Sequence, residues 1–135
     1  VCSSDLTLEE IRKNESSPKQ ALKDIIRGYI HYSLTHPEQY KVVFFSNPSL
    51  YGRPEEFTSR DTMSLRCWKK FIELFDDCMK SGVFRPMDCD TLSIVFWSAI
   101  HGLISSLIFT KDFPMPDAGV MTELLLDGLF KGYSP

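Results

Sequence analysis

The feature that most constrains this chain is an apolar stretch, Leu92–Phe109, which runs for eighteen residues without a Lys, Arg, Asp or Glu. As a helix, it approaches the length that crosses the hydrocarbon core of a bilayer. Four serines and one histidine interrupt it, however, and its flanks are acidic, with Asp88, Asp90 and Asp112. Trp97 also lies inside the stretch, whereas membrane helices place tryptophan at their ends. The pattern therefore favours a helix of a globular domain, and no membrane partner is expected.

A helix that is apolar on every side needs cover on every side, and its own core can cover one face only. The stripe that suits close approach of another helix consists of Ser98, Gly102, Ser105, Ser106 and Phe109. A neighbouring bulky stripe, which suits a core or a pocket, consists of Ile94, Trp97, His101, Ile104 and Ile108. The last helix offers a matching surface of Met121, Leu124, Leu125, Gly128 and Leu129. We therefore expect helices 89–110 and 117–131 of two copies to pair as a four-helix bundle, which makes the protein a homodimer.

Helical spacing of apolar residues also dominates the rest of the chain, and no alternating strand pattern stands out. Ser17 followed by Pro18 marks a helix start, and Pro37 ends one helix and opens the next. Gly82 lies where a C-terminal glycine cap belongs, and Asp88 is the expected N-cap of the charge-free helix. The predicted helices span about 18–36, 38–45, 54–81, 89–110 and 117–131, with a helical remnant at 8–13. The sequence thus predicts an all-α fold, a bundle of about five principal helices.

Charge argues against nucleic-acid binding by this chain itself. Its 15 basic and 18 acidic side chains give a formal net charge of -3. The basic residues gather only in short pairs, Arg12 with Lys13 and Lys69 with Lys70. A surface that grips DNA needs clustered Lys and Arg to neutralise phosphates.

Metal and cofactor sites are not expected either. The cysteines lack the Cys-x-x-Cys spacing of zinc and redox sites and stand at Cys2, Cys67, Cys78 and Cys89. They are interpreted as small buried thiols, with a thiol sensor as the alternative. His31 and His36 fall on different sides of one helix, so they do not form a joint metal site.

Aromatic and polar side chains on the predicted helices are candidates for lining a ligand pocket. The candidate ligand-binding residues are Tyr29, Tyr32, Phe44, Cys67, Phe71, Phe75, Trp97 and His101. Pockets for small molecules are mostly apolar with few polar groups, and no Arg or Lys is placed inward by the pattern. An apolar or aromatic effector therefore fits better than a charged one. The alternative for each ring is plain core packing, and the alternative for His101 is a core histidine bonded to a serine or a backbone carbonyl.

Catalysis finds little support in the sequence. There is no Gly-x-Ser-x-Gly, phosphate loop or zinc-protease motif. The acidic pairs Asp76–Asp77 and Glu55–Glu56 are interpreted as a solvated face and a helix start. We expect a non-enzymatic domain, while a stand-alone small-molecule-binding module and an enzyme with an unrecognised site remain alternatives.

Three motifs, taken in order, resemble a known family. The first is Ser-Pro…Leu…Tyr…His-Pro-Glu-Gln-Tyr-Lys-Val-Val-Phe, which begins at Ser17. The others are Trp97-x-x-x-His101-Gly102 and, near the end, Asp127-Gly128-Leu129. Together they resemble the C-terminal domains of TetR-family transcriptional regulators, one class of which is named for a Trp-His-Gly signature. The resemblance covers about residues 7–133.

The resemblance implies a function and a mechanism. It implies a cytoplasmic homodimer that binds an effector in each protomer and represses transcription until the effector releases the operator. DNA binding would then belong to an N-terminal helix-turn-helix, and a short helix at 8–13 would connect to it.

The first six residues are expected not to be native. Residues 1–6, Val-Cys-Ser-Ser-Asp-Leu, resemble the in-frame translation of a common short-read sequencing adapter. On this interpretation, residues 7–135 form the effector-binding and dimerisation domain, and the helix-turn-helix domain is missing. A genuine N-terminal tail is the alternative.

Overall fold

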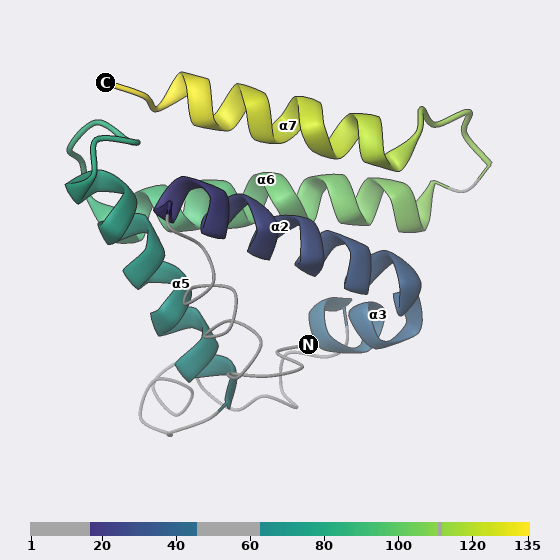
Figure 1. Ribbon diagram of the computed structural model, residues 1–135. Coiled ribbons are helices and arrows are strands. Elements are labelled where there is room, and N and C mark those ends of the chain that lie inside the picture. The colour runs from purple at the N-terminus through teal and green to yellow at the C-terminus, as the bar shows by residue number, and fades with distance from the viewer. Residues whose placement is uncertain (1–16, 46–62, 111) are drawn as a thin grey trace.

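A computed structural model of the chain describes residues 17–45, 63–110 and 112–135. Within these residues the fold is all-α, as predicted, with five helices and no strand (Figure 1). The helices are α2 (Pro18–Thr35), α3 (Pro37–Phe45), α5 (Met63–Lys80), α6 (Cys89–Phe109) and α7 (Ala118–Gly132). The predicted remnant at 8–13 and the predicted helix start at 54 lie outside the described residues.

Local sequence signals set the helix ends. Ser17, Asp88 and Asp117 are N-caps, and their side chains accept the backbone N–H three residues further on at 3.4, 2.9 and 3.0 Å. Such caps satisfy donors that the first turn of a helix leaves unpaired. Gly82 follows α5 with φ of 78°, a left-handed conformation that glycine adopts without steric cost. The caps predicted at Ser17, Asp88 and Gly82 are therefore confirmed.

Helix α6 packs against three other helices, α2, α5 and α7. In Figure 1, α7 runs antiparallel beside it, α2 crosses it, α5 descends from its N-terminal end and α3 lies towards its C-terminal half. Pro37 separates α2 from α3, and the turn between them lets α3 fold back beneath α2. The two ends of α6 consequently face different surroundings, because α5 meets α6 near its N-terminal end and α3 lies towards its C-terminal half.

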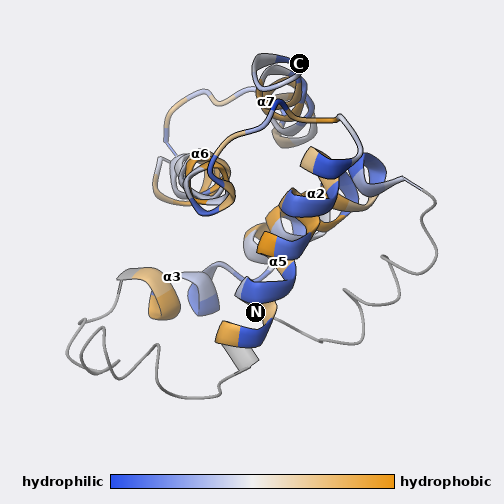
Figure 2. Ribbon diagram, turned by 90° about the vertical axis from the view of Figure 1, so that its left-hand side faces the viewer, coloured by the Kyte–Doolittle hydropathy of each residue, from blue (hydrophilic) through white to orange (hydrophobic). Residues whose placement is uncertain are grey.

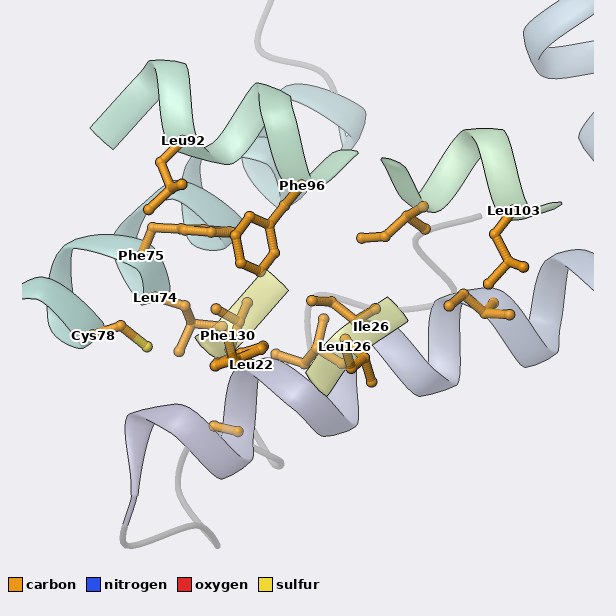
Figure 3. Packing of buried hydrophobic residues seen from close by; sticks show 14 of the residues in the cluster. Leu22, Ile26, Leu74, Phe75, Cys78, Leu92, Phe96, Leu103, Leu126 and Phe130 are labelled. Carbon is orange, nitrogen blue, oxygen red and sulfur yellow. The ribbon is translucent and has the colours of Figure 1, made fainter. Parts of the chain in front are cut away.

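The main core lies at the α5 end and is rich in phenylalanine (Figure 3). Phe96 on α6 is fully buried, and its ring centroid lies 4.9 Å from Phe75, 5.4 Å from Phe84 and 5.6 Å from Phe130. Rings at these separations add pairwise attraction to the gain from burying their area. These contacts bring α5, α6, α7 and the segment after α5 together around one side chain.

Helix α6 has a covered face and an uncovered face. Its covered residues, which pack against the other helices, are Leu92, Ser93, Phe96, Ile100, Leu103, Ile104 and Ile108. On the other side, Ile94 is 52% exposed, and Phe109 is 50% exposed with the Lys41 ammonium 5.7 Å from its ring centroid. By length and composition alone this helix passes as a membrane span, although 44% of the apolar window is buried inside the fold. Figure 2, which views α6 and α7 almost end-on, places hydrophobic residues on more than one side of α6.

Candidate functional site

His101 lies between two tyrosine hydroxyls that come from two other helices. Its Nε2 is 3.0 Å from the hydroxyl of Tyr29 on α2, and its Nδ1 is 2.8 Å from the hydroxyl of Tyr40 on α3. A neutral imidazole has one N–H donor and one acceptor nitrogen. One tyrosine therefore donates to the ring and the other accepts from it, and the tautomer decides which. His101 thus ties α2, α3 and α6 together at one point.

Aromatic rings surround the imidazole. The ring centroid of Trp97 lies 4.1 Å from that of His101, and the centroid of Phe44 lies 4.3 Å from it. Tyr40 stacks on the imidazole at 5.5 Å, and Tyr29 tilts against it at 5.6 Å. We call these five residues, Tyr29, Tyr40, Phe44, Trp97 and His101, the His101 cluster. It combines large apolar area with a small hydrogen-bonding centre, which is the composition of small-molecule sites.

The centre of this cluster is uncharged at neutral pH. Burial lowers the pKa of His101 to about 4, because desolvation penalises the imidazolium form. Burial also raises the pKa of Tyr40 above its ordinary value, so its hydroxyl keeps its proton. The hydrogen bonds at the centre of the His101 cluster therefore join neutral groups rather than ions.

Helix periodicity explains why these side chains meet. Tyr40 and Phe44 are four residues apart on α3, and Trp97 and His101 are four apart on α6, so each pair shares a face. The backbone of His36 joins α2 to α3. Its N–H donates to the carbonyl of Tyr32, and its carbonyl accepts the N–H of Tyr40. The cluster forms where these two faces and Tyr29 converge.

The structure distributes the predicted ligand-binding residues over three places. Tyr29, Phe44, Trp97 and His101 meet in the His101 cluster. The hydroxyl of Tyr32 instead donates to Gln39 at 2.7 Å, at the exposed corner between α2 and α3.

The remaining candidates lie on α5. Phe71 and Phe75 pack on each other at 4.9 Å, and Phe75 continues into the core around Phe96. Cys67 is buried on the same helix. Ligand contact by any of these residues stays a prediction.

Tyr40 is the residue that the sequence analysis missed. Its side chain is only 3% exposed, and its hydroxyl makes the shorter of the two contacts to His101. The signal that could have found it is its spacing from Phe44, which matches the spacing of Trp97 from His101. Spacing shows that the two residues of each pair share a helix face. It does not show that the two faces meet.

The residues predicted for a dimer interface lie mostly on the uncovered side of α6 and α7. Ser98, Gly102 and Ser106 are exposed in this order along α6. The hydroxyl of Ser106 donates to the carbonyl of Gly102 at 2.7 Å, and that of Ser105 donates to the same carbonyl at 3.2 Å. These serines thereby satisfy their hydroxyls within their own helix, which leaves a small and largely non-polar stripe.

The residues predicted for the α7 part of this surface differ in how far they are exposed. Leu124 is 68% exposed, and Gly128 is exposed beside it. Met121 and Leu125, in contrast, are partly buried and pack against the protomer's own core. Val120, which was not predicted, is 54% exposed and continues the apolar surface.

Metal binding finds no support in the part of the chain that the structure describes. Among residues 17–45, 63–110 and 112–135, no group of three or more His, Cys, Asp or Glu side chains could hold an ion. Cys78 is buried, and burial raises the pKa of its thiol to about 12, so it keeps its proton.

Replacing Tyr40 with phenylalanine should destabilise the fold by about 1–3 kcal/mol, because His101 then loses the partner at its Nδ1 inside a buried cluster. Tyr32→Phe is the matched control, since its hydroxyl bond to Gln39 is exposed and its loss should cost less than about 0.5 kcal/mol. Urea unfolding of both variants measures the difference. Equal losses for the two variants would contradict a structural role for the contact between Tyr40 and His101.

Comparison with known protein families shows a match that covers most of the chain. A family model of tetracyclin repressor-like C-terminal domains matches residues 22–129. The matched range runs from the second turn of α2 almost to the end of α7 and contains the whole His101 cluster. No match was found among curated proteins or among solved structures. Because the family match spans most of the sequence, the chain belongs to the family of tetracyclin repressor-like C-terminal domains.

Proposed function

We propose that this chain is the effector-binding and dimerisation domain of a TetR-like transcriptional repressor. The observation that carries the proposal is the His101 cluster, an uncharged hydrogen-bonding centre walled by aromatic rings within a domain of this family. The protein would act in the cytoplasm, and DNA would be bound by an N-terminal helix-turn-helix that precedes this domain. The domain itself would do no catalysis.

The proposed effector is a small uncharged molecule, apolar or aromatic. Trp97 and Phe44 offer ring faces and edges for stacking, and their centroids lie 6.1 Å apart. The neutral imidazole of His101 supplies one polar anchor, and no Lys or Arg belongs to the cluster. A charged effector would lose its hydration here without gaining an opposite charge.

Effector binding would act through α2. Tyr29 fastens α2 to α6 through His101, and Tyr40 fastens α3 to the same ring. A ligand that takes over one of these hydrogen bonds favours a different position of α2 relative to α6, and so shifts the population between two arrangements. In the family, the DNA-binding helices precede this domain, so a displaced α2 would change the spacing of the two recognition helices and release the operator.

Dimerisation is assigned to the uncovered side of α6 and α7. Exposed apolar residues remain on both helices, among them Ile94 and Phe109 on α6 and Val120 and Leu124 on α7. Two such helix pairs related by a two-fold axis would form a four-helix bundle and remove these side chains from water.

A thermal-shift screen tests the effector proposal. Uncharged aromatic compounds should stabilise the chain, by about 2.7 kcal/mol at one hundred times the dissociation constant, and their carboxylate or ammonium analogues should not. His101→Gln should abolish the shift, whereas His31→Gln, which changes an exposed histidine on α2, should retain it. Stabilisation by charged analogues alone, or hits that His101→Gln leaves unchanged, would contradict the proposed site.

A further inference from the structure

A bidentate ion pair joins α2 to α7. Arg27 on α2 donates through Nε to one carboxylate oxygen of Glu123 on α7 at 2.7 Å, and through Nη2 to the other oxygen at 2.9 Å. The Nη1 of Arg27 donates to Asp24, one turn earlier on α2, at 3.0 Å. A guanidinium held by two carboxylates has a fixed direction as well as a fixed distance. The pair therefore defines where α2 lies relative to α7.

A second basic side chain of α2 supports this arrangement. Lys23 lies one turn before Arg27, and its ammonium is 5.1 Å from the ring centroid of Phe130 on α7. The two helices run in roughly opposite directions in Figure 1, which agrees with the reversed order of the α7 partners. Arg27 first, and Lys23 to a lesser extent, lower the pKa of Glu123, so its carboxylate stays ionised. A basic edge of α2 thus lies along α7.

Helix α2 is also fastened to α6, only two residues further on. The hydroxyl of Tyr29 lies 3.0 Å from Nε2 of His101. Residues 27 and 29 point about 200° apart around a helix, so they reach different neighbours. The contact to α6 joins neutral, partly buried groups, whereas the ion pair to α7 joins charged, partly exposed ones. A shift of α2 relative to α6 and α7 therefore acts on both contacts together.

We infer that the ion pair between Arg27 and Glu123 is a latch that holds α2 in the position in which Tyr29 contacts His101. Its effect on operator release rests on the proposed action of the effector through α2. An effector that displaces α2 must also break the latch, so the latch raises the effector concentration needed, by up to about fivefold for a partly exposed pair. Salt screens such a pair, so ionic strength also changes the position of this equilibrium.

Native-state hydrogen exchange of the α2 amides tests the latch without an effector. Glu123→Gln should speed exchange in α2 by up to about fivefold and leave α5 unchanged, because only the opening of α2 becomes easier. Raising sodium chloride from about 0.05 to 1 M should bring wild-type α2 towards the rate of the variant and leave the variant itself unchanged. Asp127→Asn is the matched control, since its carboxylate bonds Lys131 within α7. It should keep the wild-type exchange rates in α2.

The side-chain ¹⁵N resonances of His101 give a second measurement. Glu123→Gln should shift them, because a loosened α2 weakens the contact between Tyr29 and His101, whereas Asp127→Asn should not. Unchanged α2 exchange and unchanged His101 resonances in Glu123→Gln would overturn the latch. Equal acceleration in α2 and α5 would also overturn it, because the pair would then stabilise the whole fold rather than the position of α2.

The outcomes for the latch and for the proposed function are separate. The latch is measured in the free chain, whereas the effector site is tested by the thermal-shift screen. A screen without any stabilising compound would contradict the effector site and leave the exchange and resonance results standing. Failure of the latch in these measurements would leave the stabilisation of the wild-type chain by uncharged aromatic compounds unaffected.

Discussion

Replacing Gly102 with leucine should convert the proposed dimer into a monomer without unfolding the protomer. Within one protomer a Cβ at Gly102 meets nothing within 4 Å, so the new side chain finds space there. Leucine also favours a helix over glycine by up to about 1 kcal/mol. In a close helix crossing, however, each added side chain overpacks the contact at a cost of about 1–3 kcal/mol, and two-fold symmetry applies this cost twice. The dimer dissociation constant should therefore rise by at least about tenfold.

Gly28→Leu provides the matched control for this experiment. Gly28 is an exposed helical glycine on α2, and a Cβ there also meets nothing within 4 Å. It should gain the same helix propensity and keep the wild-type mass in light scattering at micromolar concentration. If Gly102→Leu remains a dimer as stable as the wild type, α6 does not form the interface near this residue. A wild-type mass near 15.5 kDa would exclude a stable dimer altogether.

Truncating Phe96 to alanine should cost about 3–5 kcal/mol of folding stability, the largest loss expected from a single change in this protomer. Its side chain is fully buried, and its ring lies within 5.6 Å of Phe75, Phe84 and Phe130. Removing it leaves a cavity where α5, α6 and α7 meet, and rigid rings around the cavity cannot close it. A domain of this size has only about 5–15 kcal/mol of stability, so the variant should be partly unfolded at modest urea concentrations.

The same substitution, phenylalanine to alanine, at an exposed position is the matched control. Phe113, in the connection between α6 and α7, is 66% exposed, and Phe113→Ala should alter stability by less than about 0.5 kcal/mol. Urea unfolding followed by circular dichroism measures both variants. A loss below about 1 kcal/mol for Phe96→Ala would mean that the packing around this ring is looser than the structure places it.

Local chemistry made the helices predictable. Ser17 and Asp88 cap helices because their side chains accept backbone donors, and these effects reach only three residues along the chain. Pro37 and Gly82 act at single positions, through a fixed φ and a left-handed φ of 78°. All four signals can be recognised in the sequence alone. The predicted helix ends therefore agree with the observed ends to within about two residues wherever the structure describes them.

The candidate site could be predicted only in part, because periodicity tells which residues share a face and not what that face meets. Trp97 and His101 were singled out from their stripe on α6, but Tyr40, the closest hydrogen-bonding partner of His101, was not. The sequence alone does not distinguish Tyr32 from Tyr40 as a partner of His101. The turn at His36 then sends Tyr40 inward to His101 and leaves Tyr32 at the exposed corner with Gln39.

The sequence by itself determined that Leu92–Phe109 is one helix whose charge-free surface requires cover on all sides. Only the tertiary structure decided which side of this helix the other helices of the protomer bury. Helices α2, α5 and α7 bury the side with Phe96 and Ile104, and they leave Ile94 and half of Trp97 at the surface. The reason is physical: helix ends follow from contacts within one turn, whereas the choice of covered face follows from how several rigid helices pack around one another.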